Sequence, residues 1–444
     1  MDANPNTVPQ PQAPLQARWL SIVGIGEDGV DGLGELARGL IESAEIVFGG
    51  SRHLSLAAAL IHGTAHAWSS PFEGSVAEVL SHRGRQVCVL ASGDPFQHGI
   101  GSALARYIAP DETIVIPALS AFSLAASRLL WPLAATTLIS LCGRSLDFIR
   151  PHLQPGVRIL ALTSGATAPQ AIAEVLCATG FGASQLTVLE ALGGPRERVR
   201  SVRASAFDLD QVTALNTVAI EVVADRTARI LTRAAGLPDE LFEHDGQITK
   251  REIRALTLSA LAPARGQHLW DIGAGSGSIA IEWMLADQSL SAVAIERRSD
   301  RAARIRRNAA AFGVPDLQVL EADAPQALQG LQPPDAIFIG GGVSRSAADA
   351  PGAAGMPGAT GAVPGGATAG TIEIAQAALK PGGRLVINAV TLETEAILLR
   401  MHSEHGGSLL RLEIQRASPV GGEQTKLSGW RAARPITQWT WVKP

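Results

Sequence analysis

The chain has few of the features that mark secreted or membrane proteins. It contains only three cysteines in 444 residues, Cys88, Cys142 and Cys177, which are far apart and in apolar settings. We therefore expect buried free thiols, with no disulfide and no metal site. No apolar run approaches the roughly 20 residues that a bilayer-spanning helix needs. Residues 1–17 are rich in proline and glutamine, without a basic stretch followed by an apolar one. They predict a disordered leader and not a secretory signal, so we expect a cytoplasmic protein with no membrane partner.

Charge of either sign is also not in excess. The chain has 37 Lys and Arg against 41 Asp and Glu, for a net charge of −4. A nucleic-acid enzyme usually carries a basic face, whereas the arginines here occur only in local clusters. One such cluster, 297–307, is interpreted as a solvated helix face. A base-stacking motif such as Asn-Pro-Pro-Tyr is also missing, so we expect no nucleic-acid partner.

The length predicts two domains, because 444 residues exceed one ordinary hydrophobic core. Residues 18–225 alternate between strand-like and helix-like segments, and the pattern resets after Gly156. We therefore expect two α/β subdomains with a cleft between them. A polar helical stretch at 225–234 is expected to act as the linker, which we place at 226–240.

The second domain, 241–444, predicts an open, doubly wound parallel sheet of the Rossmann type. Its expected strands are 268–272, 292–295, 318–321, 336–339 and 384–388, with an antiparallel edge formed by 409–416 and 436–443. The segment 346–370 is almost only Ala, Gly, Pro, Thr and Asp. Such a composition cannot offset the entropy of ordering, so it predicts a mobile loop.

The most informative stretch of the second domain runs from Asp271 to Gly277. An apolar run brings Gly273, Gly275 and Gly277 to the start of an expected amphipathic helix at 278–285. Glycine suits these positions because a Cβ would block a positive φ or the approach of a ligand. The spacing G-x-G-x-G differs from the dinucleotide fingerprint G-x-G-x-x-G, which favours S-adenosylmethionine (SAM) over NAD or a purely structural turn. Glu296 ends the next apolar run, where its carboxylate can accept both ribose hydroxyls.

The whole chain from Trp19 onward resembles the family of fused precorrin-6Y C5,15-methyltransferases (decarboxylating) of cobalamin biosynthesis. The first half is similar to tetrapyrrole (class III) SAM methylases, and the second to a class I methylase that also decarboxylates. The matching stretches of the first half are 23–28, 48–54, 91–101, 116–122 and 192–198. Those of the second half are 242–250, 271–277, 321–324, 337–342 and 388–393. One departure is Pro117-Ala-Leu-Ser-Ala121, where many class III methylases have Pro-Gly-x-Ser-Ser.

The resemblance implies a SAM site in each half. The residues it implies for the first site are Gly24, Gly26, Ser92, Gly93, Asp94 and Ser120. Asp94 could equally form an Asx-turn, and the two glycines a tight βα turn without a ligand. In the second site Asp323 and Ala324 are expected to flank the adenine, and Thr249 to touch SAM or to cap the following helix.

Methyl transfer to an electron-rich carbon needs no protein nucleophile, so acid–base groups are required only to move protons. The candidates are His244, Asp245 and Glu393. Each has a structural alternative: His244 and Asp245 could cap a local turn, and Glu393 could simply lie at the start of a helix.

A tetrapyrrole with acetate and propionate arms also needs cations. Arg196, Arg198 and Arg200 alternate, so they share one face of an extended segment, and Arg52 is a further candidate. The alternative is a solvated hairpin edge.

The resemblance implies a bifunctional SAM-dependent enzyme for a precorrin-6-type macrocycle. It would methylate C5 and C15 and decarboxylate the ring C acetate, and relatives of both halves imply a homo-oligomer. The alternative is a single-site methyltransferase for RNA or protein, with the first half a non-catalytic scaffold.

Overall fold

The computed structural model describes residues 18–69, 73–340, 366–420 and 427–444. The chain divides into two compact units, Met1–Leu146 with His152–Arg229, and Ile230–Pro444 with Asp147–Pro151. The expected leader and residues 346–365 of the expected mobile loop lie outside the described residues. None of the described helices has the length and apolar character needed to cross a bilayer.

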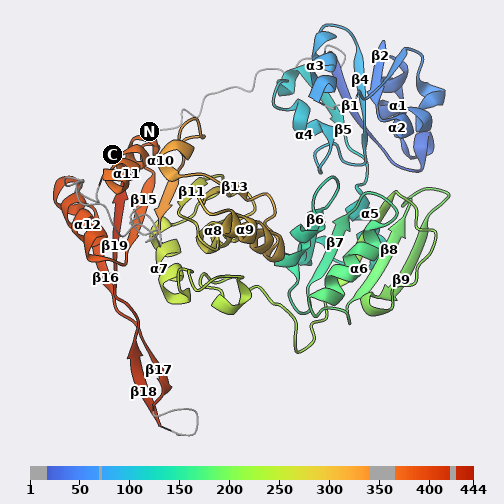
Figure 1. Ribbon diagram of the computed structural model, residues 1–444. Helices are drawn as coiled ribbons and strands as arrows, with labels where there is room; N and C mark the ends of the chain where they lie inside the picture. Colours follow the sequence, from blue (N-terminus) through green and yellow to red (C-terminus); the bar gives the residue numbers. More distant parts are fainter. Residues whose placement is uncertain (1–17, 70–72, 341–365, 421–426) are drawn as a thin grey trace, which may run out of the picture. The chain divides into compact units, whose positions relative to one another are not determined.

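The first unit opens on a five-stranded parallel sheet with the order β3-β2-β4-β1-β5. Its strands are β1 (Leu20–Ile25), β2 (Ile46–Gly49), β3 (Thr64–Ala67), β4 (Val87–Ser92) and β5 (Thr113–Ile116). Alternate side chains point to opposite faces, so Val87 and Val89 of β4 join one core while Cys88 and Leu90 join another. Helices cover both faces (Figure 1): α1 (Glu35–Glu42) and α2 (Ser51–Leu56) one, α3 (Glu73–Ser81) and α4 (Ile100–Leu104) the other.

A second, mixed sheet completes the first unit, with the order β6-β7-β10-β8-β9. Its strands are β6 (Thr136–Ser140), β7 (Arg158–Leu162), β8 (Gln185–Glu190), β9 (Arg198–Arg203) and β10 (Asn216–Glu221). Only β6 and β7 are parallel. The helices of this part are α5 (Ala121–Leu129) and α6 (Ala168–Ala178). Two α/β subdomains were expected, but the second sheet already begins at Thr136 and not after Gly156. β6 is a half-buried edge strand, so it lacks the apolar run that marks a central strand.

The second unit is built on a seven-stranded sheet with the order β13-β12-β11-β14-β15-β19-β16. The parallel strands are β11 (His268–Ile272), β12 (Ser291–Ile295), β13 (Gln318–Leu320), β14 (Ala336–Ile339) and β15 (Arg384–Ala389). β19 (Ile436–Val442) and β16 (Ser408–Leu412) form the expected antiparallel edge. The predicted Rossmann-type fold is confirmed.

Helices lie on both faces of this sheet. One core contains side chains of α7 (Arg251–Leu261), α8 (Ser278–Ala286) and α9 (Ser299–Phe312). The other contains side chains of α10 (Ala324–Ala327), α11 (Gly366–Ala378) and α12 (Leu392–His405). Contrary to the amphipathic pattern expected for α8, its first six residues are all buried. A helix enclosed by α7, α9 and the sheet has no solvated side.

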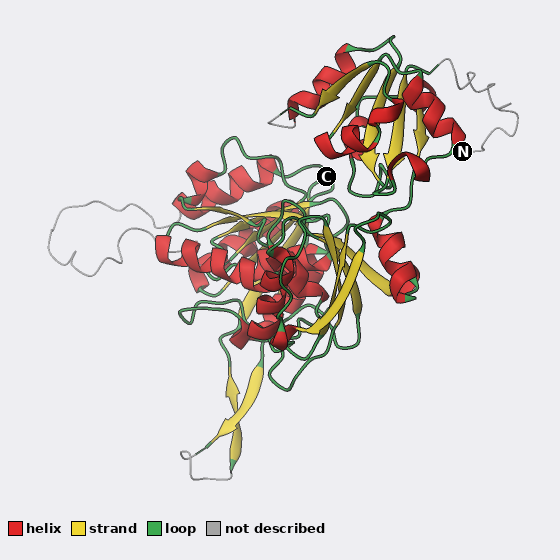
Figure 2. Cartoon of the chain, turned by 90° about the vertical axis from the view of Figure 1, so that its right-hand side faces the viewer, coloured by secondary structure: helices red, strands yellow, loops and turns green. Residues whose placement is uncertain are grey.

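Four further local expectations are wrong. Residues 366–370 are helical and not part of a loop. The expected strand 409–416 is two strands, because the chain leaves β19 after Leu412 and pairs anew as β17 (Gln415–Pro419) with β18 (Ser428–Ala432). This two-stranded ribbon projects from the rest of the unit in both views (Figures 1 and 2).

The third expectation concerns the cysteines. All three are free, but Cys142 and Cys177 are exposed, and only Cys88 is buried.

The fourth concerns 225–234, which is turn and coil and not a helix. Its backbone bonds to a neighbouring loop: the N–H of Asp225 donates to the carbonyl of Gly180, and that of Arg229 to Thr179, both at 2.9 Å. Tertiary hydrogen bonds have replaced those that a helix would supply.

This docking predicts a strong effect at Gly180. Its φ is +83°, and an added Cβ would lie 2.4 Å from the Cα of Ala228. Gly156 is the matched control, because its φ is +78° but nothing lies within 4 Å of its Cβ position. We expect Gly156→Ala to cost about 1 kcal/mol of unfolding free energy, and Gly180→Ala roughly 2 kcal/mol more. Equal losses in denaturant titrations would show that segment 225–229 does not pack against Gly180.

Candidate functional site

A cavity of about 530 Å³ lies in the first unit where β1 and β5 end. The loops after these strands, the start of α5 and the loop after β8 line it. Four of the six residues predicted to bind a cofactor in this unit are brought together here, namely Gly24, Gly26, Asp94 and Ser120. Ser92 and Gly93 are not among its lining residues.

Gly24 allows three backbone segments to meet below this cavity. An added Cβ would lie 1.9 Å from the carbonyl oxygen of Gly93 and 2.5 Å from the amide nitrogen of Ala118. That amide donates to the same carbonyl at 3.1 Å, and Gly93 has a φ of +54°. The two glycines therefore build the floor of the cavity, because no side chain fits where the loops cross.

Asp94 and Ser120 also have local roles. Oδ1 of Asp94 accepts the N–H of Phe96 at 2.8 Å, which is the Asx-turn considered above. Oγ of Ser120 accepts the N–H of Ser123 at 3.2 Å and caps α5. Oγ of Ser120 also lies 3.2 Å from Oγ of Ser123, so both predicted side chains are held by local bonds. Each oxygen still keeps further acceptor capacity.

Arg52 belongs to a polar cluster in the first unit. It pairs with the buried carboxylate of Glu27, and its Nη2 lies 2.6 Å from Oγ of Ser92 and 2.7 Å from Nε2 of His53. A guanidinium can only donate, so Nε2 of His53 accepts and the ring is neutral. Burial and the charge of Arg52 lower the pKa of His53 to about 4. The hydrogen bond from Arg52 to Ser92 therefore fixes both side chains in this cluster.

The predicted alternation of arginines on one face is confirmed for Arg198 and Arg200 of β9, and both bond to one carboxylate although Arg198 stays 40% exposed. Arg198 bonds to Glu190 through two nitrogens at 2.8 Å, and Arg200 through two at 3.2 and 3.0 Å. The Glu190 side chain is fully buried. Burial acts to raise its pKa, but bonds from Arg198, Thr213 and Arg200 outweigh this and lower it. Arg196 remains 80% exposed.

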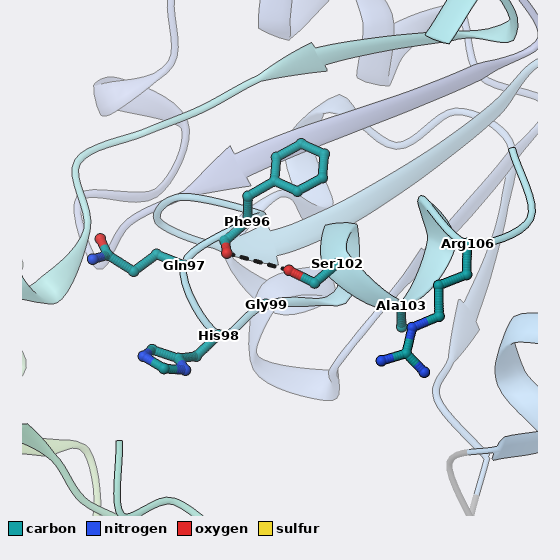
Figure 3. A pocket seen from close by; sticks show the side chains of 7 residues that line it. All are labelled: Phe96, Gln97, His98, Gly99, Ser102, Ala103 and Arg106. Atoms are coloured by element: carbon teal, nitrogen blue, oxygen red, sulfur yellow. Dashed lines mark hydrogen bonds between the residues drawn. The ribbon is translucent and has the colours of Figure 1, made fainter. Parts of the chain in front are cut away.

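A second hollow, of about 590 Å³, adjoins the first cavity, and Gln97 lines both. Its lining residues are Phe96, Gln97, His98, Gly99, Ser102, Ala103 and Arg106. Figure 3 shows His98 and Arg106 pointing to one side of the loop and Phe96 to the other. His98 has a φ of +60°, which few non-glycine residues adopt, and its ring lies 6.3 Å from that of Phe122. No pattern in the sequence had indicated this hollow.

In the second unit the glycine loop has the predicted conformation. The φ angles of Gly273, Gly275 and Gly277 are +73°, +61° and +77°. An added Cβ on Gly277 would lie 2.7 Å from a methyl group of Ile305. The N–H of Gly273 donates to Ile295 at 3.0 Å, which ties the loop to the end of β12.

Two carboxylates, Asp271 and Glu296, are buried beside this loop. Glu296 accepts the N–H of Gly275 and that of Arg298, both at 3.0 Å. Asp271 accepts the N–H of Ala280 at 3.1 Å through Oδ2, while its Oδ1 is buried without a partner among the described residues. Burial raises the pKa of Asp271 to about 7, with the nearby charge of Glu296 adding to the effect.

Asp323 and Ala324 follow the next strand of the same edge. β13 pairs with β12, and β12 with β11, so Asp271, Glu296 and Asp323 lie at the carboxyl ends of three neighbouring strands. Asp323 is exposed and is the N-cap residue of α10, without a side-chain cap bond. Its carboxylate is therefore available at the position where the resemblance expects an adenine.

The loop before α7 carries the predicted acid–base residues. Nδ1 of His244 accepts the N–H of Gly246 at 3.0 Å, and Oδ1 of Asp245 accepts that of Gln247 at 3.1 Å. Both bonds close the local turns considered above. An added Cβ on Gly275 would lie 3.6 Å from the carbonyl of Gln247, so this loop borders the glycine loop.

Asp245 is held by α9. Its carboxylate lies 2.9 Å from Arg301 and 3.4 Å from Arg304, so the interpretation of 297–307 as only a solvated face is wrong. Burial acts to raise the pKa of Asp245, but the Gln247 N–H and the two arginines lower it to about 2. A carboxylate of such low basicity is poorly suited to remove protons near neutral pH.

Thr249 and Glu393 occupy helix starts. Lys250, and not Thr249, is the N-cap residue of α7, so the capping alternative for Thr249 is wrong. Glu393 is exposed in the first turn of α12, whose N-cap Thr391 accepts the N–H of Thr394 at 3.3 Å.

A buried ion pair that the sequence analysis missed anchors this loop. Arg254 is fully buried; it lies 2.5 Å from Glu282 and 3.0 Å from Asp239, and also donates to the carbonyls of Leu237 and Thr249. The available signal was its position in α7, four residues before the buried Leu258.

Comparisons with known proteins match a different family to each of the two units. The family described as "Tetrapyrrole (Corrin/Porphyrin) Methylases" matches residues 20–208, and the "Precorrin methyltransferase domain" matches residues 240–361 and 348–443. The chain is 56% identical to a Sinorhizobium protein named precorrin-6Y C(5,15)-methyltransferase [decarboxylating], covering 96% of both chains. A Mycobacterium tuberculosis protein of the same name is 40% identical, over 95% of this chain and 99% of that protein. The cobalt-precorrin-6B C(15)-methyltransferase (decarboxylating) of Salmonella typhimurium is 31% identical, over 42% of this chain and 86% of its own length.

The buried carboxyl of Asp271 predicts a pH-dependent stability. Its pKa rises from 3.8 in the unfolded chain to about 7 in the fold, so its contribution favours folding fully only below pH 3.8. That contribution is lost as the pH rises to 7. Asp271→Asn should remove this pH dependence. Between pH 4 and pH 7 its free energy of unfolding should rise by roughly 2–4 kcal/mol relative to that of the parent. Urea unfolding at several pH values checks this, with the exposed Glu321→Gln as control, and parallel curves for parent and Asp271→Asn would contradict it.

Proposed function

The chain belongs to the family of precorrin-6Y C5,15-methyltransferases (decarboxylating), and we propose that each of its two units carries its own methylation site for one corrin precursor. It is a methyltransferase of cobalamin biosynthesis that methylates C5 and C15 of a precorrin-6-type macrocycle and decarboxylates the ring C acetate. The alternative of a methyltransferase for RNA or protein is not favoured by these relatives.

One observation carries the proposal of two sites: each unit has its own place for a nucleoside-like ligand. In the first unit this is the cavity of about 530 Å³ over Gly24. In the second it is the glycine loop, where Oδ1 of Asp271 and Oγ of Ser276 are buried without partners among the described residues. Unpartnered buried polar atoms beside three glycines of positive φ fit a ligand that brings its own donors and acceptors.

SAM is the methyl donor that fits both places, and when bound it supplies an electrophilic methyl group. In the first unit Gly24, Gly26, Asp94 and Ser120 would contact it. Ser92 and Gly93 do not line the cavity, and they would support its floor through their backbone and through the contact with Arg52. The second site is proposed to use Asp271, Gly273, Gly275, Gly277, Thr249, Glu296, Asp323 and Ala324. Glu296 would use its remaining lone pairs for the ribose hydroxyls, because each oxygen already accepts one backbone N–H.

We assign C5 methylation to the first unit, and C15 methylation with decarboxylation to the second. The Salmonella relative named for the C15 reaction alone corresponds to 42% of this chain, which supports confinement of that chemistry to one unit. Loss of carbon dioxide leaves a carbon that must gain a proton. We propose His244 for this step as an imidazolium: protonation of Nδ1 would replace the bond that it accepts from the N–H of Gly246, and transfer of the Nε2 proton to the carbon would leave a neutral ring. Glu393 is the second candidate, and Asp245 holds the loop.

The macrocycle's carboxylate arms need cations that are not already neutralised. Arg198 and Arg200 are occupied by Glu190, and Arg52 by Glu27. Arg106 has no ion-pair partner among the described residues, and it lies with His98 in the hollow that adjoins the SAM cavity. We assign these two residues to the carboxylate arms, together with Arg196, which lies 3.7 Å from the carboxylate of Glu27 but keeps 80% of its side chain exposed.

This assignment predicts a contrast between two arginines. Arg106→Ala should raise the KM of C5 methylation for the macrocycle about tenfold without changing the unfolding free energy, since it removes a charge from an exposed site. Arg198→Ala should instead destabilise the first unit by roughly 3 kcal/mol, because it leaves Glu190 buried with one arginine fewer. Steady-state kinetics and urea titrations separate these effects, and an unchanged KM in Arg106→Ala would remove that residue from the substrate site.

The number of sites is tested by SAM stoichiometry and product mass. We expect two SAM per chain by calorimetry, and a product with two added methyl groups that has lost one carbon dioxide. Ser123→Trp should fill the first cavity and Gly275→Val should block the glycine loop, each leaving one site. A mixture of the two variants should restore the full product, because the intermediate can pass between separate sites. One SAM per chain with a single added methyl group would overturn the bifunctional assignment.

A further inference from the structure

The two loops of the second unit's site are joined by one buried amide. Oδ1 of Asn308 accepts the N–H of Glu243 at 2.9 Å. Its Nδ2 donates to the carbonyl of Glu243 at 3.0 Å and to the carbonyl of Ser276 at 2.9 Å. Glu243 begins the turn that carries His244, and Ser276 lies inside the glycine loop. One side chain therefore sets the separation between the proposed proton donor and the proposed SAM cradle.

The Asn308 side chain is suited to hold that separation. It is only 2% exposed, and its amide makes three hydrogen bonds to backbone groups. Backbone partners cannot change rotamer, so the three bonds hold the amide plane and both loops in a single arrangement. A hydrogen bond to a mobile side chain would not fix the two loops in this way.

The same face of α9 makes the other contacts to these loops. Arg301 and Arg304 pair with Asp245, and Ile305 packs against Gly277. Together with Asn308 they occupy positions i, i+3, i+4 and i+7, which lie on one side of a helix. Asn308 is the member of this face that contacts both loops through its own polar atoms.

We propose that Asn308 is a positioning residue that couples the His244 turn to the glycine loop, so that tight SAM binding and decarboxylation by the second unit require its amide. This inference rests on the proposed function, because it takes SAM binding by the second unit as its premise. Asn308 touches no reacting atom. Its effect is to keep the proton donor and the SAM cradle in register, where a small displacement is costly for the rate.

The test uses the full-length chain with Ser123→Trp as the parent, so that binding reports on the second unit alone. Asn308→Ala should weaken binding of S-adenosylhomocysteine about tenfold, as expected for lost hydrogen bonds in a preorganised site. The kcat of decarboxylation should fall further, by roughly 10- to 100-fold. Amide hydrogen exchange at Gly246 and Gln247 should become at least about tenfold faster. Asn308→Asp should not rescue the site, since it keeps the acceptor but loses both donors.

Arg307→Ala is the matched control. It lies on the same helix and pairs with the side chain of Glu243 at 2.9 Å, but both side chains are 56% exposed. Exposed pairs contribute little, so we expect binding, kcat and exchange within about twofold of the parent. C5 methylation, measured without Ser123→Trp, should be unchanged by Asn308→Ala and excludes general misfolding.

The outcomes are distinguishable. If the Ser123→Trp parent itself binds no S-adenosylhomocysteine, the proposed function fails. If the parent binds it and Asn308→Ala binds equally well with unchanged exchange, the proposed function stands and the role of Asn308 is wrong. An equal loss of both methylations would also overturn that role, because it would indicate general destabilisation.

Discussion

Both units depend on the same constraint, which is that parallel strands end side by side at one edge of a sheet. The loops that leave neighbouring strands must share a narrow space, and their backbones come into contact there. In the first unit the backbones of Gly93 and Ala118 lie where a Cβ of Gly24 would be. In the second, Gly277 leaves room for Ile305 of α9. Glycine at these crossings brings bare peptide groups to the surface of each site, and that surface is where a small ligand can meet the backbone.

Buried charge in this protein mostly holds loops in place. Arg254 with Glu282 fixes the segment before α7, and Glu190 with two arginines fixes the edge of the second sheet. Removing one member of such a group strands the other, so these pairs specify an arrangement more than they add stability. Asp271 differs because no cation among the described residues pairs with it. Its raised pKa is the expected result of burial beside another carboxylate.

The division of labour between paired and unpaired cations has a consequence for substrate recognition. An arginine already bonded to a buried carboxylate presents little net charge to a polyanionic ring, however exposed its outer edge is. Arg106 is a cation left for that purpose in the first unit, because it lines the second hollow and has no ion-pair partner among the described residues. Arg196 is 80% exposed but shares Glu27 with Arg52. The position of an arginine in the sequence therefore says less about substrate binding than the contacts that its guanidinium already makes in the fold.

The amino-acid sequence by itself determined the five parallel strands of the second unit, the glycine loop and the acid after β12. Those features follow from local hydrophobic period and from the φ angles that only glycine tolerates, so they are readable in short windows. The tertiary structure decided the rest. It replaced a helix at 225–234 by bonds to Gly180, divided 409–416 between two sheets, and neutralised Arg198 and Asp245 with distant partners. A partner far along the chain leaves no mark in local spacing, because burial and pairing arise only when the fold brings the two groups together.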